Sequence, residues 1–335
     1  MGTRRACVAA EHAKRPVRPR HRGIVVAVTV VVVVSVVAAC LVLGVFGKTD
    51  VKEPAAVSST AAPKKTARRP HASDASPAPK TLTVDPAEQA KKDEQTRLDG
   101  LKGTLEQQMA GYGGTWSAYV EDLNTGAAIS VNDHQQPSAS LIKLYVMLAV
   151  YTQIAQGKLA ETPAIDQLLQ QMITVSSNQA ANSLVSTLGG GDAQTGFAVV
   201  NQIAQDNGFG HSRMNDLLYD SGTHDSSLKQ TSVDDCGRFL AEAYRGQLVS
   251  KTVSDNMVNL LLGQQRRNKI PSGLPAGTKV GNKTGEIPGT ENDAAIIWTN
   301  KGAYVLTVMS ENVSNASAQT DIQQLSSMVW STMNQ

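Results

Sequence analysis

Cysteine is scarce in this chain: of its 335 residues only three are cysteine, and Cys236 alone lies beyond the first fifty. A folded region with a single cysteine cannot form an internal disulfide, so its stability has to come from a packed core. The six histidines are scattered, and neither an HExxH motif nor a Cys/His pair accompanies them. The ligand spacing of a zinc site is therefore missing, and we expect neither a metal nor a cofactor.

A strong excess of charge of either sign is also missing. Lysine and arginine together number 31, and aspartate and glutamate 29, which gives a formal net charge of +2. Without a basic excess the protein has little with which to neutralise phosphates, so we do not expect nucleic acid as a partner. The length is compatible with one large domain or with two small ones.

The N-terminal segment has the composition of a membrane anchor. Residues 1–23 contain seven lysine or arginine residues, and residues 24–46 follow without a charge and are dominated by valine. An apolar run of this length spans a bilayer as a helix, and the basic block keeps residues 1–23 in the cytoplasm. The alternative is a lipoprotein signal that ends at Cys40, where Val37-Ala38-Ala39 precedes the cysteine. Both interpretations place the rest of the chain outside the cell and tethered to the membrane.

Residues 47–87 are rich in alanine, proline, serine, threonine and lysine. Six of the thirteen prolines fall in this stretch, and it contains no aromatic residue. Such a segment cannot bury enough apolar surface to offset the entropy of ordering it. We therefore expect a disordered linker between the membrane and a folded domain that covers residues 88–335.

The first half of this domain begins with a helix and two strands. A stripe of leucine and methionine predicts a helix over 88–109. Alternating apolar residues predict strands around 116–120 and over 127–131, with a turn at Asn124-Thr125-Gly126. Helical patterns then dominate from 140 to 263, and within them Ser232 with Asp235 predicts the start of a helix.

Strands return in the second half, at 278–284, 294–299 and 304–309, and an amphipathic helix over 317–330 closes the chain. Strands from both ends of the domain must then share one sheet, with the end helices packed on it and the helical block beside it. This order predicts an α+β fold with a cleft between the sheet and the helical block.

Ser140 and Lys143 form a Ser-x-x-Lys motif at the start of an apolar helix. Residues three apart lie on the same side of a helix, so the Lys143 amine can reach the Ser140 hydroxyl. A hydroxyl needs a base to become a nucleophile at neutral pH, and lysine serves only when burial or a nearby cation lowers its pKa. The motif is weak by itself, because Ser226 and Lys229 repeat its spacing in a polar loop.

Two further short motifs follow along the chain. Ser176-Ser177-Asn178 lies in a predicted break between helices, where the ordinary interpretation is a helix cap. Ser130-Val131-Asn132 has the same Ser-x-Asn form, so this signal is weak too. Lys283-Thr284-Gly285 ends a predicted strand and occurs once. A lysine on a strand edge is usually solvated, but this sequence can also place an ammonium, a hydroxyl and an open backbone edge along one wall of a cleft.

In this order, the three motifs resemble those of penicillin-recognising serine enzymes, and their context is similar to the class A β-lactamases. The similarity extends over about residues 95–333 and includes the segments 172–182, 273–278 and 292–298. The resemblance implies that family's fold, an antiparallel sheet with flanking end helices plus an all-helical subdomain, which agrees with the α+β order above. We expect the catalytic domain to be monomeric.

The resemblance also assigns functions to the motif residues. Ser140 attacks a lactam or peptide carbonyl, Lys143 takes its proton, and Ser176 passes a proton to the leaving nitrogen. Lys283 supplies a positive field that helps to keep Lys143 neutral. The substrate-binding residues are Asn178 for a side-chain amide, Thr284 for a carboxylate, and the backbone at Gly285 and Glu286, where the N–H of Glu286 joins that of Ser140 in an oxyanion hole.

The loop between residues 208 and 231 departs from the class A pattern. Class A enzymes carry a glutamate in a Glu-x-x-Leu-Asn segment there, which activates the deacylating water, and this loop contains no glutamate. Alignment puts Leu218 at that position, with Asp216 and Asp220 as the nearest carboxylates, although loop aspartates often serve turn geometry instead. We therefore expect acylation of Ser140 followed by slow release. Glu286 adds a negative charge near the carboxylate site, where it either weakens penicillin binding or points to solvent.

The sequence thus predicts an extracytoplasmic, membrane-anchored serine hydrolase that forms an acyl-enzyme with β-lactams or related peptidoglycan-derived peptides. One alternative is a D-alanyl-D-alanine peptidase, that is, a penicillin-binding protein that uses the same serine. The other is a non-catalytic cell-wall binding module that retains the cleft. A covalent adduct on Ser140 distinguishes both enzymes from the binding module.

Overall fold

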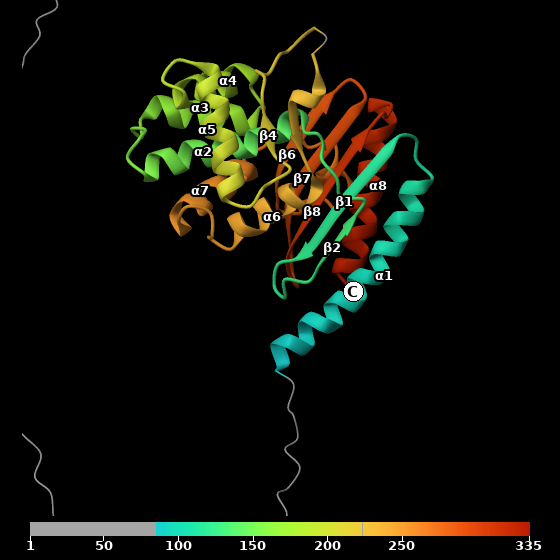
Figure 1. Cartoon of the computed structure of the whole chain (residues 1–335). Helices are drawn as coiled ribbons and strands as arrows, with labels where there is room; N and C mark the ends of the chain where they lie inside the picture. Colours follow the sequence, from blue (N-terminus) through green and yellow to red (C-terminus); the bar gives the residue numbers. More distant parts are fainter. Residues whose placement is uncertain (1–84, 223) are drawn as a thin grey trace, which may run out of the picture. The chain divides into compact units, whose positions relative to one another are not determined.

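Residues 85–222 and 224–335 are described by a computed structural model of the chain (Figure 1). They belong to one compact unit, Pro77–Gln335. The predicted cytoplasmic tail, the predicted anchor with Cys40, and the linker up to residue 84 lie outside the described residues. Among the helices that are described, none combines the length and the apolarity needed to cross a bilayer.

An antiparallel sheet runs through the described domain. Its strand order is β2-β1-β8-β7-β6, so that strands from the two ends of the domain pair at its centre. The register aligns Ala118 with Val308 across β1 and β8. The edge strand β6 is held on one side only, by β7. The five strands of this sheet are β1 (Thr115–Asp122), β2 (Ala128–Val131), β6 (Val280–Ile287), β7 (Thr290–Thr299) and β8 (Gly302–Glu311).

Helices α1 (Pro86–Ala110) and α8 (Asn315–Met333) pack on one face of this sheet (Figure 1). The apolar stripe predicted for the first helix points into this layer, because all four of its predicted members are buried. One core therefore fills the space between the two helices and the sheet, and its fully buried members include Leu98, Leu105, Ile322, Leu325 and Val329.

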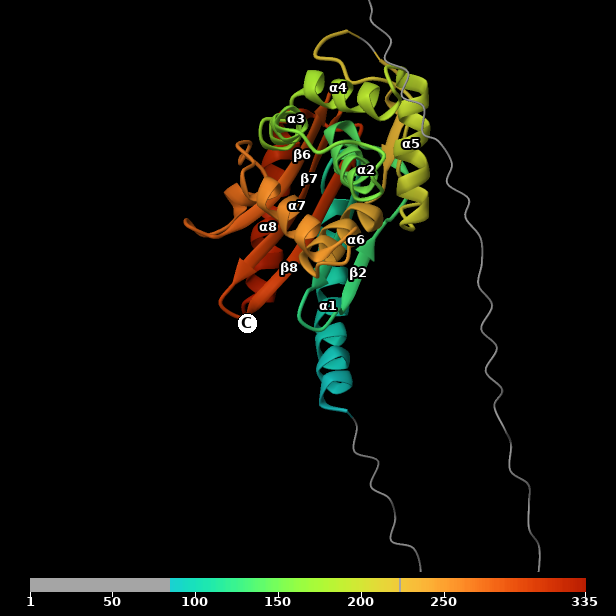
Figure 2. The same cartoon turned by 90° about the vertical axis from the view of Figure 1, so that its left-hand side faces the viewer.

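The other helices lie on the opposite side of the sheet (Figure 2). Helix α2 (Lys143–Ala155) is buried continuously over its first nine residues, from Lys143 to Tyr151. A helix that is apolar on every side is stable only in the interior. Helices α3 (Pro163–Thr174), α4 (Asn178–Leu188) and α5 (Ala193–Asp206) pack directly against it. Helix α6 (Val233–Tyr244) contacts it through the rings of Phe239 and Tyr145, and α7 (Lys251–Leu262) packs on α3 and α6.

The predicted α+β fold, with end helices on an antiparallel sheet and a helical subdomain, is confirmed. The predicted helix start at Ser232 is confirmed as well, because its hydroxyl accepts a hydrogen bond from the backbone N–H of Asp235.

Short strands, however, interrupt the region predicted as helical from 140 to 263. Strands β4 (Arg213–Met214) and β5 (Lys229–Thr231) pair in a second, small sheet with β3 (Gln136–Pro137). Strands of two or three residues show no alternation, so the sequence carries no signal for them. Strand β7 also begins at Thr290 rather than at 294. The residues just after Thr290 are polar, so in the sequence they resemble a loop. In the structure their side chains are buried and held by hydrogen bonds and ion pairs, so the strand begins there.

Candidate active site

Ser140 lies in a short 3₁₀ helix, η1 (Ala139–Ile142), which leads directly into α2. Ala139 has a φ of +45°, in the left-handed region that residues other than glycine seldom adopt. The side-chain amide of Asn292 on β7 ties this turn to the sheet, because it donates hydrogen bonds to the carbonyl oxygens of Pro137 and Ser138. The turn therefore holds Ser140 beside the edge strand β6.

Lys143 begins α2, and its side chain is completely buried. The amine nitrogen Nζ lies 3.0 Å from the Ser140 hydroxyl oxygen Oγ. It also lies 2.6 Å from the carbonyl oxygen and 3.1 Å from the hydroxyl oxygen of Ser176, and 2.7 Å from Oδ1 of Asn178. The amine thus connects the first two motifs of the sequence at one point.

Burial and, to a smaller extent, the positive charge of Arg266 together lower the pKa of Lys143 to about 7, against the opposing effect of Asp220. A lysine with an ordinary pKa is protonated at neutral pH and cannot accept a proton. With a pKa of about 7, a large share of the Lys143 amine is neutral. The first motif therefore has the geometry and the basicity that nucleophile activation requires.

Ser176 connects α3 and α4 with a φ of +61°. Its hydroxyl oxygen lies 3.1 Å from Nζ of Lys143 and 2.8 Å from Nζ of Lys283. The neighbouring Ser177 caps α4 by accepting a hydrogen bond from the backbone N–H of Ala180. The ordinary capping interpretation is thus correct for Ser177, while the hydroxyl of Ser176 points between two lysines.

Lys283 on β6 is also completely buried, in contrast to the usual solvated lysine of a strand edge. Its amine donates hydrogen bonds to Oγ of Ser176 and, at 2.7 Å, to the carbonyl oxygen of Thr284. Burial lowers the pKa of Lys283 well below its ordinary value, and the positive charges of Lys143 and Arg266 add to this effect. The third motif therefore meets the first two through Ser176.

Thr284 and Gly285 continue the same strand. The Thr284 hydroxyl is buried and has no hydrogen-bond partner among the residues that the structure describes. A Cβ atom on Gly285 would lie 2.8 Å from the carbonyl oxygen of Ser138 and 3.2 Å from the backbone nitrogen of Ser140. Only a glycine lets the two backbones come so close. The edge of β6 therefore passes directly beside the backbone N–H of Ser140.

Glu286, the next residue, does not simply point to solvent. One oxygen of its carboxylate lies 2.9 Å from Nη1 of Arg266, and the other lies 3.2 Å from Nζ of Lys269. Burial opposes ionisation, but these two cations hold the pKa of Glu286 below its ordinary value. Sequence reasoning missed Arg266 and Lys269, which lie between α7 and β6 and belong to none of the three motifs.

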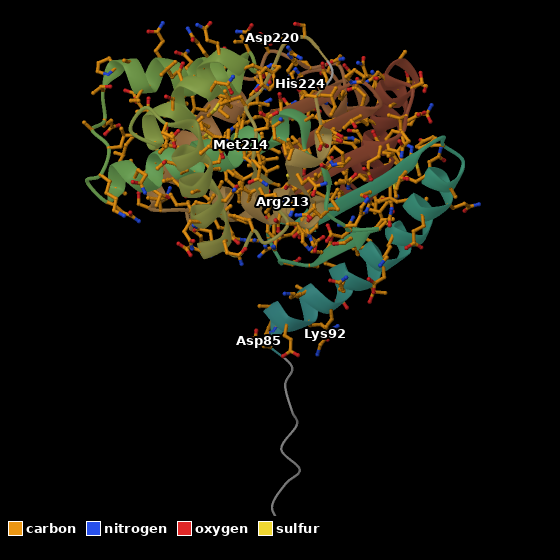
Figure 3. The ribbon with its side chains drawn as sticks, turned by 45° about the horizontal axis from the view of Figure 1, so that its top comes forward. Asp85, Lys92, Arg213, Met214, Asp220 and His224 are labelled. Atoms are coloured by element: carbon orange, nitrogen blue, oxygen red, sulfur yellow. The ribbon has the colours of Figure 1, made fainter. Side chains whose placement is uncertain are left out.

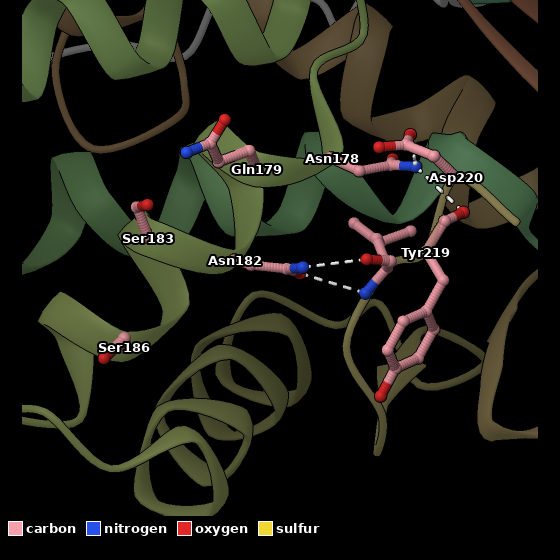
Figure 4. Close-up of a pocket in the computed structure, with 8 residues that line it drawn as sticks. Asn178, Gln179, Asn182, Ser183, Ser186, Tyr219 and Asp220 are labelled. Carbon is pink, nitrogen blue, oxygen red and sulfur yellow. Dashed lines mark hydrogen bonds between the residues drawn. The ribbon is translucent and has the colours of Figure 1, made fainter. Parts of the chain in front are cut away.

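Asn178 begins α4 and faces the loop that carries Asp220 (Figure 4). Its amide nitrogen donates hydrogen bonds to Oδ1 of Asp220 at 2.7 Å and to the carbonyl oxygen of Tyr219 at 3.0 Å. Asp220 and His224 project from this same loop at the rim of the domain (Figure 3). Together with α4 the loop borders an open hollow of about 590 Å³.

Leu218 on the same loop is buried, with 7% of its surface exposed. Its backbone N–H donates to Oδ1 of Asn182, and its carbonyl accepts from Nδ2 of the same side chain, at 2.9 and 2.8 Å (Figure 4). Asp216 forms an ion pair with Lys229 at 3.3 Å. Of the three loop residues singled out in the sequence, Asp220 is therefore the one connected to Lys143, through Asn178.

Two other segments share the spacing of these motifs, Ser226 with Lys229 and Ser130 with Asn132, but their side chains make structural contacts. Lys229 donates to Asp216 and to the carbonyl of Leu217, not to Ser226. Asn132 donates to the carbonyl oxygen of Trp116 on β1. The structure therefore separates these look-alike motifs from the set around Ser140. Within the described residues, no cluster of three or more potential metal ligands occurs.

The close approach at Gly285 gives a direct prediction. We expect Gly285→Ala to displace β6 from the turn before Ser140 and to lower the free energy of unfolding by about 1–3 kcal/mol, because the added Cβ meets a backbone oxygen. The rate of acylation should fall with it, since the Ser140 N–H shifts relative to the strand. Thermal unfolding and acylation kinetics measure the two effects. The matched control is Gly103→Ala, where nothing lies within 4 Å of the new Cβ; a similar loss there would contradict this explanation.

Comparison with known proteins identifies relatives of the whole domain. A model of a family described as the beta-lactamase enzyme family matches residues 100–166 and 160–333. Beta-lactamase FAR-1 of Nocardia farcinica is 27% identical over 178 residues, which are 51% of this chain and 54% of the relative. The carbapenem-hydrolyzing beta-lactamase KPC of Klebsiella oxytoca is 26% identical over 226 residues, 59% of this chain and 76% of the relative. The chain thus spans just over half the length of the first of these curated relatives.

Solved structures show the same fold. The structure of PBP-A superposes with a TM-score of 0.63 at 23% identity, over 70% of this chain and 96% of that one. A leucine-to-glutamate mutant of PBP-A, determined as an acyl-enzyme complex with penicillin G, gives a TM-score of 0.64, also at 23% identity, over 71% and 97% of the two chains. An ancestral class A beta-lactamase gives 0.60 at 23% identity, over 69% of this chain and 99% of that one.

Proposed function

This chain belongs to the beta-lactamase enzyme family, and on that premise we propose that it is a serine hydrolase acylated on Ser140 by β-lactams or related wall peptides. The observation that carries this proposal is the position of the Lys143 amine, 3.0 Å from the Ser140 hydroxyl and with a pKa of about 7. Acylation of this kind breaks an amide C–N bond, the bond that β-lactams and wall peptides share.

In the proposed acylation, neutral Lys143 removes the proton from Ser140 Oγ as this oxygen bonds to the carbonyl carbon. The C–N bond then breaks, and the proton passes from Lys143 through the Ser176 hydroxyl to the leaving nitrogen. Lys283 donates a hydrogen bond to Ser176 and orients this relay. At the end Lys143 is neutral again, and the acyl group is an ester of Ser140.

The negative charge that develops on the carbonyl oxygen needs hydrogen-bond donors. We assign these to the backbone N–H groups of Ser140 and Glu286. The narrow spacing at Gly285 supports this assignment, because it brings β6 to the Ser140 nitrogen. A single donor of this kind typically contributes about 3 kcal/mol to stabilisation of the transition state.

We propose further that the acyl group leaves slowly. Hydrolysis of the ester needs a base beside the attacking water. Leu218 has no group for this purpose, Asp216 is engaged with Lys229, and Asp220 accepts a hydrogen bond from Asn178. Asp216 and Asp220 are thus both held by other side chains, which supports an enzyme that acylates and then stalls.

A labelled penicillin tests acylation directly. The wild-type protein and a Ser140→Ala variant are each incubated with the labelled penicillin, separated from it under denaturing conditions and digested. We expect label on the peptide that contains residue 140 in the wild-type protein and none in the variant. If label appears on another residue, or equally in both proteins, the assignment of Ser140 is wrong.

A D-alanyl-D-alanine peptidase is the second candidate. The glutamate-free loop favours it, because a penicillin-binding protein does not need rapid release of a β-lactam. A stem peptide that ends in D-alanyl-D-alanine distinguishes the two candidates, because a peptidase releases the terminal D-alanine. A non-catalytic wall-binding module would give neither label on Ser140 nor released D-alanine.

The proposed location is the outer face of the cell membrane, with residues 24–46 as a single-pass anchor and a monomeric catalytic domain. The basic block of residues 1–23 and the apolar run after it support this topology. Palmitate labelling of the full chain that disappears in Cys40→Ser would contradict the transmembrane anchor and favour a lipoprotein. A dimer in light scattering would contradict the monomer.

A further inference from the structure

Beside the third motif, the protein holds its own carboxylate between two cations. Glu286 follows Gly285 on β6, and its oxygens contact Arg266 at 2.9 Å and Lys269 at 3.2 Å. The Glu286 side chain keeps 28% of its surface exposed, and that of Arg266 47%. This pair therefore lies at the open border of the site and not in its interior.

Lys269 lies beneath the Glu286–Arg266 pair, in the interior of the domain. Its side chain is completely buried, and its ammonium lies 2.5 Å from a carboxylate oxygen of Glu291. It also donates to the carbonyl oxygens of Gly285 and Asn292, at 3.2 and 3.0 Å. A buried ammonium with so many partners cannot turn towards a ligand without leaving a carboxylate unpaired. Lys269 thus fixes Glu286 in place.

The charges of this cluster cancel. Arg266 and Lys269 supply two positive charges, and Glu286 and Glu291 supply two negative ones. No surplus positive charge remains in the cluster to attract an anionic group of a substrate. Without Glu286 the cluster would carry one positive charge in excess, and the half-exposed Arg266 would be the cation left without a carboxylate partner.

The hydroxyl of Thr284, which lies near Glu286, is a polar group without a hydrogen-bond partner among the described residues. Thr284 and Glu286 are alternate residues of β6, so their side chains lie on the same face of the strand. The Thr284 hydroxyl is buried without a hydrogen-bond partner among the described residues. A buried hydroxyl without a partner is costly, and a substrate group placed here would satisfy it. The group that Thr284 binds would then lie beside the Glu286 carboxylate.

We propose that Glu286 occupies the place of a substrate carboxylate, and that the site therefore prefers a substrate whose group beside Thr284 is uncharged, such as an amide or an ester. This inference rests on the proposed function, because it concerns the substrate that acylates Ser140. Glu286 is a specificity-determining residue in this account: its side chain selects by charge, while its backbone serves the oxyanion.

The test compares two forms of one β-lactam, benzylpenicillin and its methyl ester. The second-order rate constant for acylation of Ser140 is measured for each form by mass spectrometry, and the ratio of acid to ester is calculated for every variant. Within one protein the ratio cancels small changes in folding, and comparison of the ratio between variants cancels the effect of the ester's size. We expect Glu286→Gln to raise this ratio about tenfold or more, because it leaves the positive charge of Arg266 without its carboxylate partner. Arg266→Gln should lower the ratio.

Asp255→Asn is the matched control, since it removes one negative charge from an exposed pair on α7. We expect its ratio to equal that of the wild type. An unchanged ratio in Glu286→Gln, with Ser140 still acylated, overturns the inference and leaves the proposed function intact. An equal rise in Asp255→Asn overturns it as well, because net charge alone would then explain the effect. The absence of any adduct with both forms in every protein overturns the proposed function, and the inference with it.

Discussion

Replacement of Lys143 by methionine should slow the acylation of Ser140 about a thousandfold, the usual effect of losing a positioned general base. The amine lies 3.0 Å from the serine hydroxyl and is the base that the described site places beside it. Methionine fills a similar volume without accepting a proton. Lys143→Arg is the informative companion, because arginine keeps a donor for Ser176 but stays protonated at all relevant pH values.

Lys143→Met and Lys143→Arg should therefore slow acylation to a similar extent, because neither side chain can accept the proton of Ser140. Stopped-flow measurement with a chromogenic cephalosporin gives the rate constants, and thermal unfolding shows whether the fold is retained. Methionine removes a buried amine, so no loss of stability beyond that of the broken hydrogen bonds is expected. If Lys143→Arg retains most of the wild-type rate, Lys143 does not act as the base.

The pH dependence of the wild-type rate follows from the same residue. The active form of Lys143 is the neutral amine, and the pKa of Lys143 is about 7. Below that pH the rate of acylation should fall about tenfold per pH unit, and above it the rate should become constant. A rate that declines as the pH rises through 7 would mean that the protonated amine is the active form.

Leu218→Glu should shorten the lifetime of the acyl-enzyme about a hundredfold or more. It introduces a carboxylate on the loop that faces the start of α4, where a base for the deacylating water is missing. The backbone of Leu218 is held by Asn182 through two hydrogen bonds, which do not depend on the leucine side chain. The substitution should thus leave the path of the loop unchanged.

Leu218→Glu should also lower the stability of the fold, because only 7% of Leu218 is exposed and the substitution buries a carboxylate there. We expect a loss of about 1–3 kcal/mol in the free energy of unfolding. Leu218→Gln is the matched control, because glutamine has nearly the same shape as glutamate and is polar but has no basic group. A lifetime shortened equally by glutamine, or unchanged by glutamate, would show that position 218 is not the missing base.

The sequence predicted the fold well where the signals were periodic. The stripe of α1 is repeated over several turns, and all its members are buried. The alternating Trp116, Ala118 and Val120 of β1 likewise lie in the core that α1 and α8 cover. The small sheet of β3, β4 and β5 was missed because its strands are too short for any period. The early start of β7 was missed because buried polar residues look like loop residues in a sequence.

The candidate site was predictable to the extent that its chemistry lies in short motifs. The order and spacing of the motifs indicate Ser140, Lys143, Ser176 and Lys283, and the structure joins their polar atoms in a chain of hydrogen bonds in that order. The surrounding charges were not predictable. Lys269 carries no sequence signal for its complete burial, which depends on partners such as Glu291, 22 residues further along the chain.

We propose that Ser140 is acylated readily and that the acyl group is released slowly, because the base for the first step is present beside Ser140 and a base for the second is not. The most direct test is a time course of the intact mass of the protein after a brief exposure to penicillin and removal of the free compound. We predict a mass increase of one penicillin that is absent in Ser140→Ala and persists after the free compound is gone. A rapid return to the free mass, with hydrolysed penicillin in solution, would contradict the claim and identify a true β-lactamase.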